Sequence, residues 1–95
     1  MATTVGLLHL RFDVPQARSL KDKRRWVKSF KDRLRHRGNV SVAEVDALDT
    51  YRQAVLAVAM VGADRRYLEG ALQSVVNAAA THRELLLLDS QTEWL

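Results

Sequence analysis

The chain has 95 residues, of which 47% are hydrophobic and none is cysteine, and its formal net charge at pH 7 is +4. This length fits one domain, residues 1–95, which buries roughly two-thirds of its unfolded surface and needs no metal or disulfide staple. The absence of cysteine excludes disulfides, thiolate metal sites and cysteine nucleophiles. It is also typical of the cytoplasm, where we expect this protein to be located.

The apolar segments are too short for a targeting or membrane-spanning role. Residues 1–12 alternate in hydropathy and include His9 and Arg11, whereas a signal peptide needs an unbroken apolar run. The longest continuous apolar stretch, Ala54 to Val61, is about half the length that a membrane-spanning helix requires. The sequence therefore predicts a soluble protein without a membrane partner.

The first two predicted elements are a strand and a strongly basic helix. Val5 to Val14 alternates as a strand with one buried face does, and Pro15 ends it because proline cannot donate to a sheet ladder. Ser19 then caps a helix, with Asp22 placed as in a capping box, and Gly38 supplies a left-handed stop. The apolar face of this helix consists of Leu20, Val27, Phe30 and Leu34, with Trp26 at its margin.

Two strands, a second helix and a last strand follow. Asn39 to Asp46 predicts a strand whose apolar phase shifts, which indicates a bulge or burial on both faces. Tyr51 to Val61 is apolar on both faces at its centre, so we expect both faces to be covered. Asp64 caps a helix that continues through about Thr81, and the last strand runs from about Glu84 to Trp94.

The order β-α-β-β-α-β predicts a fold of the α+β class. Two split βαβ units with right-handed crossovers give a ferredoxin-like sandwich, a four-stranded antiparallel sheet with two helices on one face. The other face of this sheet would then be open and apolar, so we expect a homodimer, a shared strand or another protein to cover it. The candidate interface residues are Val5, Leu7, Val55, Ala57 and Ala59.

Positive charge is concentrated in the first helix. Ten of the fifteen Lys and Arg residues lie between Arg18 and Arg37, opposed only by Asp22 and Asp32, so this segment carries +8 and the remaining residues carry −4. Such a field attracts a polyanion, of which nucleic acid is the commonest. The alternatives are a solvated face, whose cationic stems shield the core edge, and an acidic protein partner.

The helical spacing places most of these cations on a single flank. Five of them follow one another at intervals of three and four residues, and Arg25 widens their row. Like charges at this spacing repel by a few tenths of a kcal/mol per pair, a cost that an approaching anion removes. The candidate nucleic-acid-binding residues are Lys21, Arg24, Arg25, Lys28, Lys31 and Arg35.

Three further residues on or near the helix and sheet have two interpretations each. Lys23 falls beside the inward stripe, where it snorkels to the rim or pairs with a carboxylate such as Glu44, or else is a functional lysine with a depressed pKa. Trp26 and Trp94 could stack on bases, but their positions are more typical of core or interface.

The third predicted strand lacks the aromatic pattern of an RNA recognition motif. We therefore expect the helix and loops to contact RNA or the ribosome through phosphate, with weak sequence preference.

An enzymatic alternative also has to be weighed, because small basic ferredoxin-like domains include acylphosphatases. Those enzymes have a glycine-rich phosphate loop after the first strand and an asparagine on a later one. The loop Asp13 to Arg18 has no glycine to let backbone amides wrap a phosphate, and Asn39 is more simply a turn residue. His9, His36 and His82 stand singly, without metal-ligand spacing. The sequence predicts no enzyme, cofactor, metal or small-molecule substrate.

Four segments carry a family resemblance that spans nearly the whole chain in order: Val5–Leu8, Ala17–Arg25, Asn39–Val45 and Val61–Asp64. The run Ser-Leu-Lys-x-Lys-Arg and the run Val-Ser-Val-Ala-Glu-Val are its most specific parts. With these segments the chain resembles the YlxP-like family of small bacterial proteins, a domain of unknown function. The resemblance implies a ferredoxin-like domain with no established activity and no catalytic residues to transfer. It also implies gene neighbours for translation initiation and ribosome maturation, and hence an RNA or ribosomal role.

Overall fold

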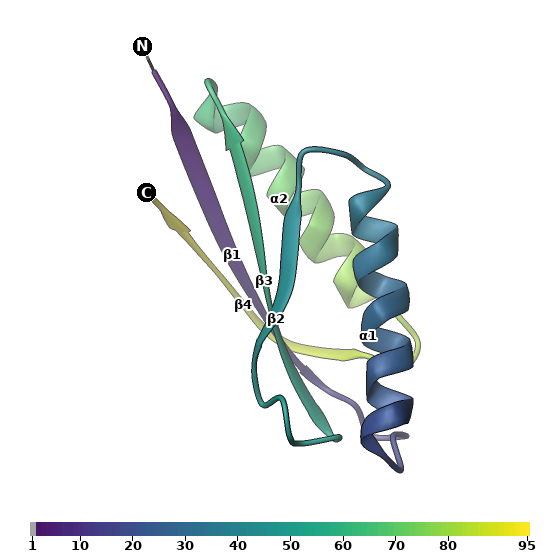
Figure 1. Ribbon diagram of the computed structural model, residues 1–95. Coiled ribbons are helices and arrows are strands. Elements are labelled where there is room, and N and C mark those ends of the chain that lie inside the picture. The colour runs from purple at the N-terminus through teal and green to yellow at the C-terminus, as the bar shows by residue number, and fades with distance from the viewer. Residues whose placement is uncertain (1) are drawn as a thin grey trace.

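Six elements build one sheet and one helical layer in the computed structural model, which describes residues 2–95. They are β1 (Thr4–Asp13), α1 (Leu20–Arg35), β2 (Ser41–Asp46), β3 (Gln53–Gly62), α2 (Arg65–Ala80) and β4 (Leu86–Trp94). The strands pair antiparallel throughout in the order β2-β3-β1-β4. Both helices cover the same face of this sheet (Figure 1). The predicted ferredoxin-like sandwich is therefore confirmed.

The element boundaries differ from the predicted ones only at the ends of strands, and local backbone geometry explains the differences. Asn39 has a φ of 51°, a left-handed conformation that a strand excludes, so β2 begins later than predicted. The N–H of Thr50 donates to the carbonyl of Ala47 in a turn, which delays the start of β3. No helix within residues 2–95 is long and apolar enough to cross a membrane.

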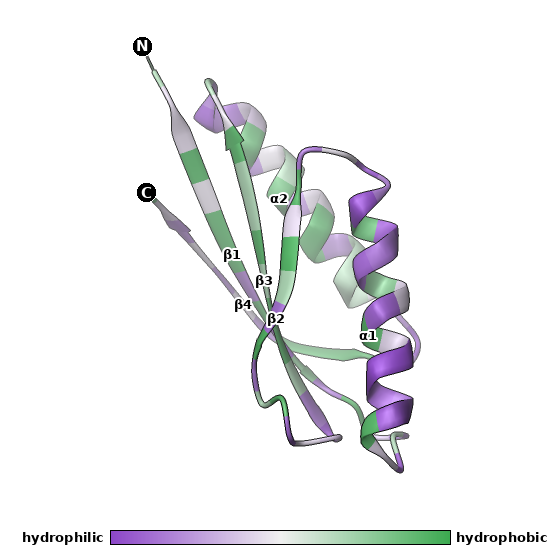
Figure 2. Ribbon diagram, viewed as in Figure 1, coloured by the Kyte–Doolittle hydropathy of each residue, from purple (hydrophilic) through white to green (hydrophobic). Residues whose placement is uncertain are grey.

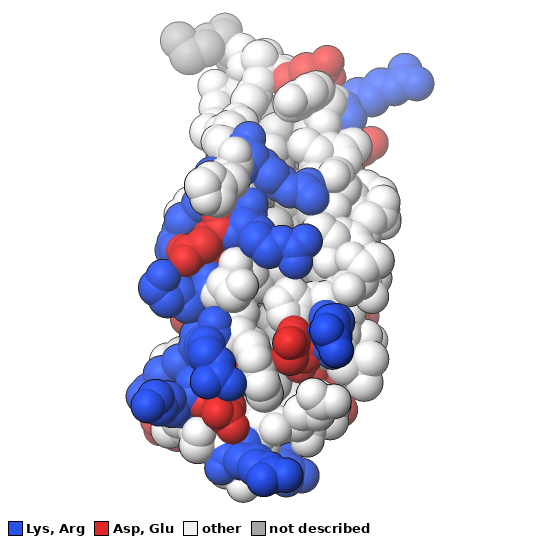
Figure 3. All heavy atoms as spheres, turned by 90° about the vertical axis from the view of Figure 1, so that its right-hand side faces the viewer, with Lys and Arg blue, Asp and Glu red and all other residues white. Residues whose placement is uncertain are grey.

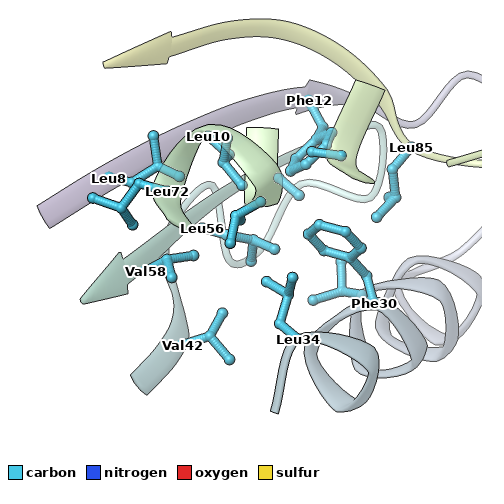
Figure 4. Packing of buried hydrophobic residues seen from close by; sticks show 14 of the residues in the cluster. Leu8, Leu10, Phe12, Phe30, Leu34, Val42, Leu56, Val58, Leu72 and Leu85 are labelled. Carbon is cyan, nitrogen blue, oxygen red and sulfur yellow. The ribbon is translucent and has the colours of Figure 1, made fainter. Parts of the chain in front are cut away.

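The core lies between the sheet and the helices and follows from the alternation of β1 and β3. Leu8, Leu10 and Phe12 point toward the helices and are fully buried. Phe12 meets Phe30 of α1 edge to face, with ring centroids 5.8 Å apart (Figure 4). Each such side chain contributes about 1.5–3 kcal/mol through burial. This packing fixes which flank of α1 turns toward solvent.

Both ends of α1 are set by the residues that the sequence indicated. Ser19 Oγ accepts a hydrogen bond from the N–H of Asp22 at 3.1 Å. The carboxylate of Asp22 accepts from the N–H of Arg18 at 3.0 Å, one residue earlier than in the capping box that we predicted. At the other end Gly38 has a φ of 74° and its N–H donates to the carbonyl of Arg35. The predicted start and stop of the helix are thus confirmed.

The last strand is held to β1 by an aromatic side chain that covers a glycine. Trp94 is the cross-strand partner of Gly6 and packs against the core, and the N–H of Leu95 adds a hydrogen bond to the carbonyl of Val5. A Cβ atom on Gly6 would lie only 2.7 Å from Leu72 Cδ1 and 2.8 Å from the Trp94 ring. Gly6 therefore provides the room that Trp94 occupies, and the core interpretation of Trp94 is confirmed.

Candidate nucleic-acid interface

The outer flank of α1 presents the predicted row of cations. All six candidate residues lie outside the core; Lys31 is half-buried and the other five are exposed. Figure 2 shows α1 as a mostly hydrophilic element, and in Figure 3 Lys and Arg side chains form a band along one side of the molecule. From Lys21 to Arg35 the row is about 21 Å long at 1.5 Å per residue. The structure therefore brings these side chains together; what they bind stays a prediction.

Half of these cations are paired with carboxylates of the same helix. Lys28 Nζ lies 2.8 Å from Asp32 Oδ2, and a guanidinium nitrogen of Arg35 lies 3.4 Å from Asp32 Oδ1. A third pair joins Arg25 to Asp22 at 3.5 Å. The hydrogen bond from Lys28, together with the charges of Lys28 and Arg35, holds the pKa of Asp32 below its usual range. Such exposed pairs typically contribute about 0–1 kcal/mol, so a phosphate can compete for these cations.

The remaining candidates carry uncompensated charge. Lys21, Arg24 and Lys31 have no carboxylate within ion-pair distance among residues 2–95. These three side chains are spaced along most of the row, so its positive potential extends over the helix. The ion pairs with Asp22 and Asp32 neutralise part of the charge of the row, but the row as a whole stays cationic.

Beyond the end of the row, another arginine bridges to the second helix. The Arg37 guanidinium donates to Ser74 Oγ of α2 at 2.7 Å. This contact holds a positive charge between the two helices at the C-terminal end of α1. Nearer the start of α1, the Arg25 guanidinium lies 5.4 Å from the Trp26 ring centre, and Trp26 itself packs against the core margin. The core interpretation of Trp26 is therefore confirmed.

Lys23 is a fully buried cation with a structural environment. Its Nζ donates to the carbonyls of Ala47 at 2.8 Å and Gln53 at 3.0 Å and lies 2.8 Å from Glu44 Oε2. Glu44 Oε2 is buried and accepts no well-directed hydrogen bond, so its contact with Lys23 is an ion pair held by charge. The predicted pairing with Glu44 is confirmed. Through it α1 fastens β2 and the loop before β3.

The two segments in which an acylphosphatase would have its phosphate loop and its asparagine make other contacts here. The loop after β1 borders a hollow of about 610 Å³ that is also lined by Arg18, Asp22 and Arg52. The carboxylate of Asp22 accepts from the Arg18 N–H in this hollow, where a phosphate would need the amide. The Asn39 side chain donates to the carbonyl of Val61 at 3.0 Å, on the far end of β3. Asn39 is thus a turn residue, as we preferred.

The histidines do not gather into a metal site in the described part of the chain, where no three potential ligands form a group. His82 stacks edge to face on Phe30, with ring centroids 5.7 Å apart. Burial lowers its pKa, and the nearby Glu84 carboxylate opposes this only partly. Its Nδ1 accepts from the backbone N–H of Glu84, a hydrogen bond that favours the neutral ring.

The open face of the sheet is apolar along β3 and polar along β4. The predicted interface residues lie together, with Val5 opposite Val61, Leu7 opposite Ala59, and Ala57 and Val55 next along β3. All five predicted residues are half-buried, and whether another molecule covers them stays a prediction. The sequence analysis missed the polar half, which consists of Asp89, Gln91 and Glu93, placed on this face opposite Arg11, His9 and Leu7.

Comparison with known families shows to which family the chain belongs. The profile of the family described as "Protein of unknown function (DUF503)" matches residues 5–92. The chain belongs to this family. It is also 29% identical over 90 residues to the "Uncharacterized protein YlxP" of Bacillus subtilis (strain 168), covering 95% of this chain and 98% of that protein. The resemblance inferred from the four sequence segments is confirmed.

Solved structures share the fold of this DUF503 member at low sequence identity. SnoaB, a cofactor-independent oxygenase from Streptomyces nogalater, superposes with a TM-score of 0.54 at 14% identity, covering 97% of this chain and 90% of SnoaB. The de novo designed protein Ferredog-Diesel gives 0.53 at 12% identity, covering 98% and 86% of the two chains. At such identities the likeness establishes the ferredoxin-like fold alone.

Proposed function

We propose that this DUF503 protein is a non-enzymatic RNA-binding protein of the cytoplasm that associates with the ribosome through the outer flank of α1. The observation that carries the proposal is the exposed row on α1, in which Lys21, Arg24 and Lys31 have no carboxylate partner among the described residues. A row of like charges is destabilising by itself. Phosphates would neutralise it and convert this cost into binding energy.

The dimensions of the row support contact with a nucleic-acid backbone. One strand of a B-form duplex has a phosphate every 3.4 Å of helix axis, so a row of about 21 Å that lies along the axis spans about six of them. The planar fork of Arg24 can donate two parallel hydrogen bonds to a phosphate, while Lys21 and Lys31 act as point charges. Contacts of this kind position a protein without reading bases, so we expect a preference for RNA shape over sequence.

The ribosome is the partner that the family resemblance implies, and co-sedimentation tests it. Purified protein should pellet with ribosomal subunits at about 50 mM salt and be released at about 200 mM, because phosphate contacts weaken steeply over this range. Each subunit is tested separately, and the protein alone serves as the control. Absence from the pellet at both salt concentrations would contradict the ribosomal proposal. Pelleting that ignores salt would indicate a protein partner.

A second candidate function, self-association through the open sheet face, is supported by the arrangement of that face. Its apolar half on β1 and β3 adjoins a polar half in which Arg11 and Asp89 are cross-strand partners. Two copies related by a two-fold axis could therefore place apolar against apolar and Arg11 against Asp89. The same protein can use both surfaces, because α1 lies on the opposite side of the sheet (Figure 1).

We expect Ala57→Asp to convert a dimer of this protein into a monomer. Ala57 lies midway along β3 on the open face, opposite His9, where a second copy would bury the new carboxylate. Light scattering after size exclusion measures the mass, and Ala63→Asp, at an exposed bend beyond β3, is the matched control. A parent protein that already has the monomeric mass would end this second candidate function.

A further inference from the structure

A small hollow lies where the row of cations on α1 ends. It has a volume of about 230 Å³ and is bounded by the turn after α1, the end of β3 and the first turns of α2. Met60 and Val75 are buried and form an apolar floor together with the half-buried Val40. The hollow is smaller than a pocket for a drug-sized ligand, which has about 300–1,000 Å³, and suits a single flat group.

The rim of this hollow is polar and includes an exposed aromatic ring. Tyr67 is 69% exposed although it borders the hollow, so its ring is accessible for stacking. Arg37 is held across the opening by its hydrogen bond to Ser74 Oγ. Asn39 uses its amide nitrogen on the Val61 carbonyl, and no hydrogen bond within residues 2–95 involves its amide oxygen. Proteins bind unpaired nucleobases with groups of this kind: an apolar floor, an aromatic ring, a guanidinium and an amide.

From this arrangement we infer that the hollow receives one unpaired nucleobase of an RNA whose backbone lies along α1. The inference rests on the proposed function, because Arg35, the last cation of the row, precedes Arg37 by two residues and leads a backbone to the opening. Tyr67 stacks on the base, and Arg37 and Asn39 face its polar edge. The substrate class is thereby narrowed to structured RNA with an accessible unpaired nucleotide.

The larger hollow at the other end of α1 is a poorer candidate for the site that binds the nucleobase. Its wall includes the Asp22 carboxylate, which repels phosphate and is held in place by the Arg18 N–H. The Trp26 ring there is accompanied by the Arg25 guanidinium and packs against the core margin. The two ends of the row therefore differ, and we assign the base to the end with Tyr67.

Three RNAs that share one duplex test the inference by fluorescence anisotropy. The first is blunt, the second has a three-nucleotide single-stranded overhang, and the third has the same overhang with abasic sites, which keeps the phosphates. The parent protein should bind the overhang about 5- to 100-fold more tightly than its abasic form, the range that stacking of one base provides. Tyr67→Ala should reduce this ratio to within about twofold and leave affinity for the blunt duplex unchanged, whereas Tyr67→Trp should retain it.

The matched control is Tyr51→Ala, which removes the other exposed tyrosine from the loop before β3. This variant should keep the full preference for bases. Equal affinity of the parent for the two overhangs, with duplex binding intact, overturns the inference while the proposed function stands. The inference also fails if Tyr67→Ala retains the preference. If the parent protein binds none of the three RNAs, the proposed function itself is overturned.

Discussion

Replacing Lys23 with alanine should lower the free energy of unfolding by about 3–5 kcal/mol, the usual cost of removing one partner from a buried ion pair. The substitution leaves the Glu44 carboxylate without its cation and removes the hydrogen bonds that Lys23 donates to the carbonyls of Ala47 and Gln53. Domains of this size have a total stability of about 5–15 kcal/mol, so the variant should unfold at a much lower urea concentration.

Two further variants separate the buried charge from lost volume. Lys23→Met keeps most of the stem and should remain destabilising, and adding Glu44→Leu should recover part of the loss because no unpaired charge is then left. Lys28→Ala, which breaks an exposed pair with Asp32, should cost less than about 1 kcal/mol. If Lys23→Ala proved as mild as Lys28→Ala, the structural role of Lys23 would be wrong.

Reversing Lys21, Arg24 and Lys31 to Glu should weaken binding to a duplex RNA on the order of 100-fold at about 0.1 M salt, because phosphate contacts are replaced by repulsion. These three cations were chosen because none has a carboxylate partner among the described residues, so no ion pair of the fold is broken. The variant should therefore unfold like the parent protein. Fluorescence anisotropy with a labelled duplex measures the affinity.

The matched control reverses Arg11, Arg66 and Arg83, which lie outside α1 and are exposed. Both triple variants change the net charge by the same amount, so a general charge effect would weaken both equally. We expect the control to bind within about fivefold of the parent, since screening limits distant charges at this salt concentration. Equal losses in the two variants would show that net charge, and not the row on α1, attracts RNA.

Local patterns predicted most of the fold and the row of cations. The alternation of β1, the Ser19 cap and the spacing of Lys21 and Arg24 depend on neighbours a few residues apart, which the sequence displays directly. The sharing of Asp32 by Lys28 and Arg35 also follows helical spacing and could have been predicted from it.

The features that sequence analysis missed depend on contacts between distant segments. The polar half of the open face requires the register of β4 on β1, which shifts between Arg11 and Phe12, so the alternation along β4 is interrupted. The hollow at the end of α1 is formed by three elements, and the hydrogen bond from Arg37 to Ser74 lies on its rim. The sequence analysis assigned no role to Tyr67, because its exposure depends on how α2 packs.

The salt dependence of RNA binding tests most directly whether α1 contacts phosphate. With about four or five phosphates neutralised, the logarithm of the association constant should fall by about 3–4 per tenfold increase in salt. In the variant with Lys21, Arg24 and Lys31 reversed, the remaining weak binding should show a clearly smaller slope. A slope near zero for the parent protein, or an equal slope for both proteins, would contradict the assignment of α1 as the RNA-binding surface.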